Sequence, residues 1–267
     1  MRSLLHLSMY FRLALIGLHL LWGATQVGIC FPFLASAVRD RLKRYWSRQL
    51  LALLGISLEA EHAALDRIGR GLVVANHVSF VDIFAINAAL PSGFVAKDDV
   101  ATWPLIGWLA RRNGTVFITR GKRRSAQRTQ QEISASLSIG RRLTIFPEGT
   151  TSAGDRVLPF HGALFQAAID AGAPIHALAI EYLDHFGNVS AAAAYIDDVS
   201  LLDCLRQILG SQGLRVRLRL AASFAPPHAD RRHVAHAAHQ AVAGTLRQRP
   251  VASPSLQPVR NAAAISP

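Results

Sequence analysis

The chain has 267 residues, a mean hydropathy of +0.23 and a formal net charge of +12. This length fits one large α/β domain or two small ones, and a single core is the simpler prediction. A positive balance suits nucleic acid, an anionic membrane surface or a phosphorylated substrate, but no nucleic-acid motif is visible and the apolar excess favours the membrane. The two cysteines, Cys30 and Cys204, have neither metal-ligand nor redox spacing, which argues against a disulfide-stabilised scaffold.

An uncharged apolar run occupies residues 13–38 and is long enough to cross a bilayer. Gly23, Gly28 and Pro32 interrupt its second half, so a bent or shallowly embedded helix stays open, as does a buried core helix. The run is too long for a cleaved signal peptide and no small-x-small cleavage pattern follows it. The sequence therefore predicts a membrane-associated segment without deciding whether it spans or embeds.

A basic belt follows the apolar run within residues 38–58, which show the apolar spacing of one amphipathic helix. The belt consists of Arg39, Arg41, Lys43, Arg44 and Arg48. Cations next to an apolar segment indicate contact with anionic headgroups at the cytoplasmic face of the inner membrane. An anionic membrane surface is thus one expected partner, and nucleic acid is not.

From residue 70 onward, short apolar runs alternate with segments of helical period. The expected strands are 72–75, 94–96, 115–119, 143–146, 175–180 and 216–224. The expected helices are 80–90, 104–112, 125–138, 163–171, 201–209 and 231–247. This alternation predicts an α/β fold, a mainly parallel mixed sheet covered by helices.

The expected organisation has three parts. Residues 1–60 form N-terminal membrane-associated helices, residues 61–249 form the main domain, and the proline-containing tail 250–267 is disordered.

His77 and Asp82 lie just after the first expected strand. A histidine beside a carboxylate is the minimum arrangement that activates a hydroxyl. The alternative is structural: Ser79 and Asp82 have the spacing of a capping box, which would make His77 an ordinary loop histidine. Both can hold together, because a carboxylate in the first helical turn can cap the helix and also orient the imidazole.

Two further polar groups follow expected strands. Glu148, Gly149 and Thr150 form a turn after the strand 143–146, where hydroxyls and backbone N–H groups could hold polar substrate atoms. An ordinary surface turn is the alternative. Arg120 ends the strand 115–119 and could grip a phosphate bidentately, whereas the neighbouring cations at 122–124 suit a solvated charge run.

These blocks, in this order, resemble the motifs of the glycerolipid acyltransferase family, the PlsC-like enzymes. Asn-His-x-Ser-x-x-Asp is matched at 76–82, Gly-x-x-Phe-Ile-x-Arg at 114–120, and Phe-Pro-Glu-Gly-Thr-x-Ser at 146–152. A fourth block, an apolar strand with prolines, is matched at Pro174, while Ala177 replaces its second proline. The resemblance covers about residues 70 to 185.

The resemblance implies acyl transfer from acyl-CoA or acyl-carrier protein to the free hydroxyl of a lysolipid, with no cofactor. 1-Acyl-sn-glycerol 3-phosphate is the first expected acceptor, and a lyso-ornithine lipid is the alternative. His77 would be the general base and Asp82 its orienting partner; Arg120, Glu148, Gly149 and Thr150 would bind the acceptor. A non-catalytic membrane-binding protein on the same scaffold is the alternative from another class.

Four histidines lie close together in the sequence near the C-terminus, as the ligands of a metal site could: His228, His233, His236 and His239. Neither a carboxylate nor a cysteine completes it, so a solvated helix face is the better interpretation and no metal is expected. The sequence also has no P-loop, dinucleotide fingerprint or Gly-x-Ser-x-Gly elbow.

Overall fold

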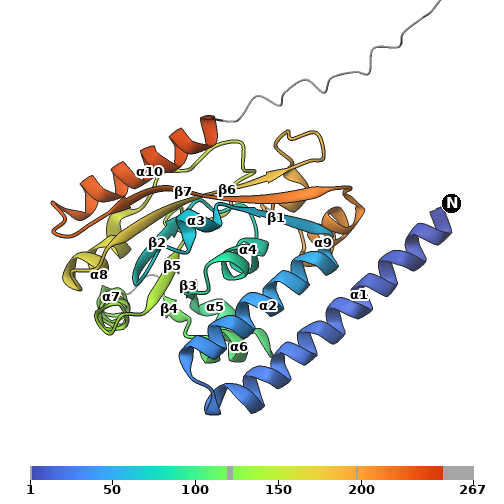
Figure 1. The fold of residues 1–267 in the computed structure, drawn as a ribbon, viewed down its shortest axis with the longest axis horizontal. Coiled ribbons are helices and arrows are strands. Elements are labelled where there is room, and N and C mark those ends of the chain that lie inside the picture. The colour runs from blue at the N-terminus through green and yellow to red at the C-terminus, as the bar shows by residue number, and fades with distance from the viewer. Residues whose placement is uncertain (1, 119–122, 197, 249–267) are drawn as a thin grey trace, which may run out of the picture.

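A central sheet organises the computed structural model, which describes residues 2–118, 123–196 and 198–248. Its strand order is β1-β7-β6-β2-β5-β3-β4, seven strands in the described residues (Figure 1). The bounds are β1 Ile56–Ala60, β2 Gly71–Ala75, β3 Gly93–Lys97, β4 Val116–Ile118, β5 Arg142–Ile145, β6 Ile175–Leu183 and β7 Leu214–Phe224. The β6–β7 pair is antiparallel and the other pairs are parallel, so the predicted mainly parallel mixed sheet is confirmed.

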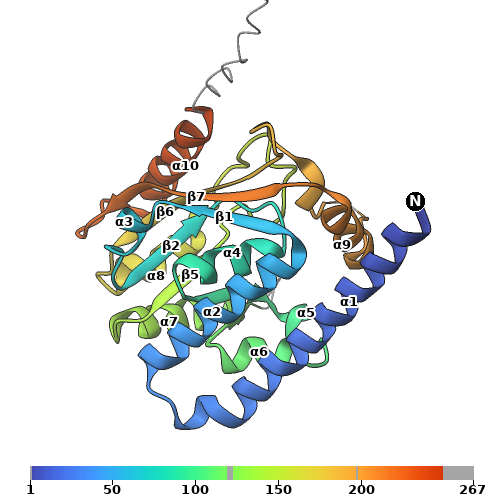
Figure 2. The same cartoon turned by 45° about the vertical axis from the view of Figure 1, so that its right-hand side comes forward.

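Helices cover both faces of the sheet (Figures 1 and 2). One core lies under α2 Ser36–Leu54, α4 Val81–Ala89 and α9 Leu201–Gly210, and the other under α7 Arg123–Ser138, α8 Phe165–Asp170 and α10 Arg231–Arg247. Within β2 the side chains alternate: Val73 and Ala75 belong to the first core, Leu72 and Val74 to the second. A strand apolar on both faces is what a sheet covered on both sides requires.

Short helices complete the described chain. They are α3 His62–Leu65, α5 Asp98–Ala101 and α6 Ile106–Arg112, with 3₁₀ turns η3 Gly162–Leu164 and η4 Ala191–Ala193. Most expected elements appear within a few residues of their predicted bounds. The last residue of the expected strand 115–119 lies outside the described residues, as does all of the expected tail 250–267.

One predicted element is wrong at its end. The helix expected over 38–58 stops at Leu54, because Gly55 adopts a left-handed conformation with φ of 75° and terminates it. The next residues, Ile56–Ala60, form strand β1, which pairs in parallel with β7 through Ile56 and Leu214. The apolar residues of β1 continue the helical spacing of α2, and this continuity concealed the change of structure.

The N-terminal segment folds back on itself. α1 Arg2–Thr25 continues through the π-turn η1 Gln26–Cys30 and the 3₁₀ turn η2 Phe31–Phe33, after which α2 returns alongside it (Figures 1 and 2). Pro32, within η2, lies where the chain reverses. A bend, one of the alternatives that the sequence left open, is therefore present in this segment.

Polar contacts fasten α1 to the rest of the protein. The Arg12 guanidinium donates to the carbonyls of Leu53 and Leu209, and the rings of His19 and Trp46 stack 4.7 Å apart. The opposite side of α1 exposes large apolar side chains, including Tyr10, Phe11, Leu18, Leu21 and Trp22. By length and composition alone, Met9–Phe33 qualifies as a candidate membrane span.

Candidate active site

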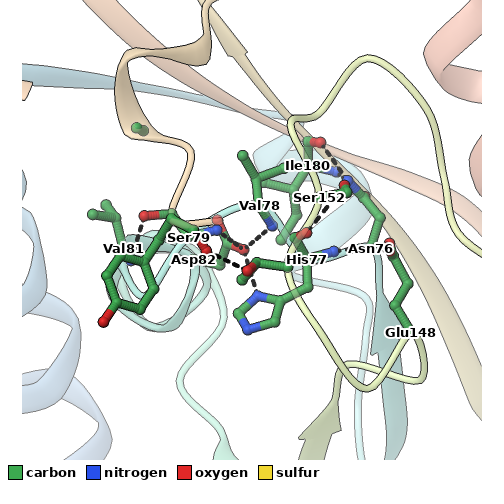
Figure 3. Close-up of polar contacts among 12 residues, drawn as sticks. Asn76, His77, Val78, Ser79, Val81, Asp82, Glu148, Ser152 and Ile180 are labelled. Atoms are coloured by element: carbon green, nitrogen blue, oxygen red, sulfur yellow. Dashed lines mark hydrogen bonds and ion pairs between the residues drawn. The ribbon is translucent and has the colours of Figure 1, made fainter. Parts of the chain in front are cut away.

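The site lies where two neighbouring parallel strands end. β2 and β5 pair through Val74 and Ile145, so the loops that follow them emerge at the same edge of the sheet. The first loop carries His77 and leads into α4, and the second carries Glu148 (Figure 3). The Asn76 side chain fixes the first loop to β6, donating to the Ile180 carbonyl at 2.9 Å and accepting from its N–H at 2.8 Å.

His77 and Asp82 form a hydrogen-bonded pair. The distance from His77 Nδ1 to Asp82 Oδ2 is 2.8 Å (Figure 3). The same oxygen accepts from the backbone N–H groups of Val78 at 2.8 Å and Ser79 at 3.0 Å. Because those groups can only donate, Oδ2 is an acceptor and Nδ1 of His77 carries the proton.

This tautomer leaves Nε2 of His77 with its lone pair and without a hydrogen bond from any described residue. The His77 side chain is 19% exposed, whereas Asp82 is fully buried. A partly exposed imidazole oriented from behind by a buried carboxylate can take a proton from a substrate hydroxyl.

Asp82 also has the structural role that its spacing suggested. It reaches back to accept from the Ser79 N–H at the start of α4, as the residue at position N3 of a capping box does. The Ser79 hydroxyl is buried and accepts from the Val81 N–H at 3.3 Å rather than from Asp82. Helix capping and imidazole orientation thus share one carboxylate.

Tyr182 is a residue of the site that the sequence did not reveal. Its hydroxyl donates to the second oxygen of Asp82, Oδ1, at 2.7 Å. Burial, together with the negative charge of Asp82, raises the pKa of Tyr182 well above its usual range, so it is a neutral donor. The strand expected at 175–180 in fact continues to Leu183 and so includes Tyr182. A longer predicted strand would have placed Tyr182 in the sheet near the site.

Glu148 lies beside the His77 loop and is 4% exposed. Its Oε1 accepts from the His77 backbone N–H at 3.0 Å, and no described residue hydrogen-bonds its Oε2. Burial raises the pKa of Glu148 to about 7, the charge of Asp82 adds to the rise, and N–H donors from His77 and Leu158 oppose it. The carboxyl therefore titrates near neutral pH at the base of the site.

The turn around Glu148 is fixed by backbone contacts. Gly149 has φ of 71°, the conformation for which glycine is suited, and its N–H donates to the Phe146 carbonyl at 3.1 Å. Thr150 is exposed. Ser152 donates its N–H to the His77 carbonyl at 2.8 Å, which joins the two loops.

The predicted phosphate-binding residue, Arg120, lies outside the described residues. The strand that precedes it, β4, ends at Ile118 and runs parallel to β3. β3 in turn runs parallel to β5, so β4 ends at the edge of the sheet that carries His77.

An apolar cavity of about 200 Å³ lies next to the site, between α1, α2, α4, β3 and α6. Its walls include Leu20, Ile83, Phe84, Phe94 and Leu109. The Phe146 ring stacks on His77 at 3.9 Å and on Phe94 at 6.2 Å, which links the imidazole to the cavity wall.

No group of three or more His, Cys, Asp or Glu side chains in the described part of the chain is arranged to hold a metal ion. His228 bonds the Ala173 carbonyl, and His236 bonds Gln240.

Comparison with known proteins identifies the family. Residues 59–181 match the family model described as Acyltransferase. The chain is 41% identical over 180 residues to 1-acyl-sn-glycerol-3-phosphate acyltransferase of Neisseria meningitidis serogroup B, covering 67% of this chain and 70% of that protein. It is 38% identical over 207 residues to lyso-ornithine lipid O-acyltransferase of Pseudomonas aeruginosa, covering 78% and 79%.

A solved structure shares the fold. The crystal structure of the 1-acyl-sn-glycerophosphate (LPA) acyltransferase PlsC from Thermotoga maritima matches 90% of this chain and 96% of that one, with a TM-score of 0.65 and 19% identity. The resemblance inferred from the three motifs is confirmed. The chain therefore belongs to the acyltransferase family and is an O-acyltransferase.

Proposed function

We propose that this acyltransferase transfers a fatty acyl group from acyl-CoA or acyl-carrier protein to the free hydroxyl of 1-acyl-sn-glycerol 3-phosphate, giving phosphatidic acid. The observation that carries the proposal is the His77–Asp82 pair at 2.8 Å, with Nε2 left to act as a base beside an apolar cavity. The similarity to the Neisseria enzymes over about two thirds of the chain supports this acceptor.

The proposed reaction is a direct transfer. Nε2 of His77 removes the proton of the acceptor hydroxyl as its oxygen attacks the thioester carbonyl carbon. Asp82 stabilises the imidazolium that forms. The tetrahedral intermediate then collapses, the carbon–sulfur bond breaks, and the thiolate takes the proton from His77. Products are the new ester and the free thiol.

An acyl-enzyme intermediate has no support in the described site. The hydroxyl nearest in sequence, Ser79, is buried and engaged with the start of α4, so it is not exposed for attack. The apolar cavity beside Phe146 suits the acyl chain, because its mostly apolar lining can bury methylene groups without leaving polar atoms of the protein unpaired. Arg120 would bind the acceptor phosphate, and Glu148, Gly149 and Thr150 would position the acceptor.

The N-terminal hairpin supports our proposal of membrane association. α1 packs on α2 and donates hydrogen bonds to the carbonyls of Leu53 and Leu209, while its outer side stays apolar and exposed. A helix held along the domain in this way suits embedding in one leaflet better than crossing both. We place the protein at the cytoplasmic face of the inner membrane, where its donors and acceptors meet.

The second candidate acceptor is a lyso-ornithine lipid. The similarity to the Pseudomonas aeruginosa enzyme covers more of this chain, 78% against 67%. Thiol release from acyl-CoA by the purified protein, measured with each acceptor in turn, separates the candidates. Turnover with 1-acylglycerol 3-phosphate would support the proposed acceptor. Turnover with lyso-ornithine lipid alone would make lyso-ornithine lipid the acceptor instead. Absence of turnover with every acceptor and either thioester would favour the non-catalytic scaffold.

A further inference from the structure

A second cavity lies at the opposite edge of the sheet from His77. Its volume is about 690 Å³, and it is bounded by residues next to the amino-terminal ends of β2, β3 and β5, by the hairpin turn and by the end of α6. Because β2 has five residues at about 3.3 Å each, its two ends lie about 13 Å apart. This cavity therefore lies at the other end of the strands from His77, and it adjoins the apolar cavity, with which it shares Phe31, Lys43, Ser92 and Asn113.

The lining of this cavity is strongly cationic. Its arginines are Arg39, Arg70, Arg111, Arg112, Arg141 and Arg142. The cavity also contains Lys43 and a single carboxylate, Asp40, which pair with each other at 2.8 Å. None of the six arginines forms an ion pair within the described chain. We call this group the basic cavity.

Three of these arginines have a structural role in the fold. Arg142 donates to the carbonyls of Ile68, Gly69 and Pro91, and burial lowers its pKa. Arg111 and Arg112 lie in the last turn of α6, where a cation complements the helix dipole.

Arg70 and Arg141 have no such explanation. Each lies in a loop just before a strand, is exposed, and makes no side-chain hydrogen bond to a described residue. Arg70 and Arg141 lie beside four more arginines and Lys43 in a concave surface. This arrangement suits a multiply charged anion, and phosphate is the anion that arginine side chains bind best.

The surroundings of the basic cavity indicate which phosphate. Phe31 and Ser36 of the hairpin turn line it, and on the same turn the apolar side chains of Ile29 and Phe33 are 64% and 87% exposed. Exposed apolar side chains next to a group of cations match the two layers of a bilayer surface, acyl chains beside phosphates. A soluble phosphate ligand would make no contact with the exposed apolar side chains of Ile29 and Phe33.

We propose that the basic cavity binds the phosphate headgroup of an anionic bilayer phospholipid and docks this end of the hairpin on the membrane. The proposal rests on the proposed membrane association but not on the proposed reaction. It assigns Arg70 and Arg141, two residues outside the basic belt, to membrane recognition, and separates this lipid from the acceptor at His77.

The test compares two double variants of the full-length protein that remove the same charge. Arg70→Gln with Arg141→Gln removes two charges from the basic cavity. Arg231→Gln with Arg232→Gln is the control and removes two charges from exposed positions on α10, a helix that does not line the cavity. Cosedimentation is measured with phosphatidylcholine vesicles, with and without phosphatidylglycerol. The expected result is about tenfold or greater weakening of phosphatidylglycerol-dependent binding for the cavity variant and less than about twofold for the control.

Three outcomes would overturn the proposal. Equal weakening in both variants would show diffuse surface charge, and no weakening would show that the cavity does not bind the headgroup. The third outcome is measured by calorimetry with inorganic phosphate or glycerol 3-phosphate. If the wild type binds either anion tightly, and the cavity variant loses this binding but still binds vesicles, the site belongs to a soluble anion. Thiol release in detergent micelles is measured in parallel, so a failure of the proposed reaction is seen separately from a failure to bind vesicles.

Discussion

Tyr182 donates a hydrogen bond of 2.7 Å to Oδ1 of Asp82, and both side chains are buried. Together with the donors to Oδ2, it gives the carboxylate partners on both oxygens. The carboxylate that orients His77 is thus held from β6 as well as from the loop that precedes its own helix.

Replacing Tyr182 by phenylalanine removes this donor and little else. Since one hydrogen bond to a charged group is lost, we expect kcat/KM for thiol release to fall about tenfold. The acid limb of its pH profile should also move to higher pH, because the carboxylate has lost a stabilising donor. Tyr195→Phe is the matched control, since no hydrogen bond from the Tyr195 hydroxyl to a described residue accompanies its ring contact with Phe80. An unchanged pH profile in Tyr182→Phe would remove Tyr182 from the site.

Glu148 makes stability depend on pH near neutrality. Its pKa is raised to about 7 by burial, so the folded protein binds a proton more tightly than the unfolded chain. The resulting stabilisation is complete below the ordinary carboxyl pKa of about 4.3 and is lost as the pH rises through 7. In Glu148→Gln this part of the decline should be absent. Urea unfolding of both proteins at several pH values measures it, and equal slopes would refute the raised pKa.

The apolar cavity should set acyl-chain length. Ala96 lines it, and Ala96→Phe fills part of the volume, so activity should shift toward shorter acyl-CoA chains. Ala63→Phe, at an exposed position on α3, is the control. Chain-length profiles of thiol release check this, and an unchanged preference in Ala96→Phe would place the acyl chain elsewhere.

Arg120 carries the expectation of phosphate binding. Arg120→Ala should raise the KM for 1-acylglycerol 3-phosphate more than the KM for the thioester, because only the acceptor phosphate loses a bidentate partner. Steady-state kinetics with each substrate varied in turn measures the two constants. Equal effects on both would count against this role.

The sequence predicted the principal geometry of the site because that geometry depends on parallel strands. Polar groups after two apolar runs meet wherever those runs pair in parallel, as β2 and β5 do. Tyr182 was missed because its approach to Asp82 depends on the register of β6 against β2, which pairs Leu178 with Ala75.

Two other features depend equally on tertiary structure. Strand β1 was missed because the apolar spacing of α2 continues beyond Gly55, and only the pairing with β7 distinguishes strand from helix there. The basic cavity combines arginines from segments far apart in the chain, including Arg39, Arg70 and Arg141. No local pattern brings them together. The division at residue 60 stays a prediction.

The central claim is that Nε2 of His77 is the base. Thiol release from acyl-CoA in the presence of 1-acylglycerol 3-phosphate, compared between the purified wild type and His77→Ala, tests it most directly. The His77 side chain is partly exposed and its loop is held by backbone contacts, so the variant should melt close to the wild type. The account predicts a loss of kcat of about 10²- to 10⁴-fold. A folded His77→Ala protein with a rate near that of the wild type would contradict it.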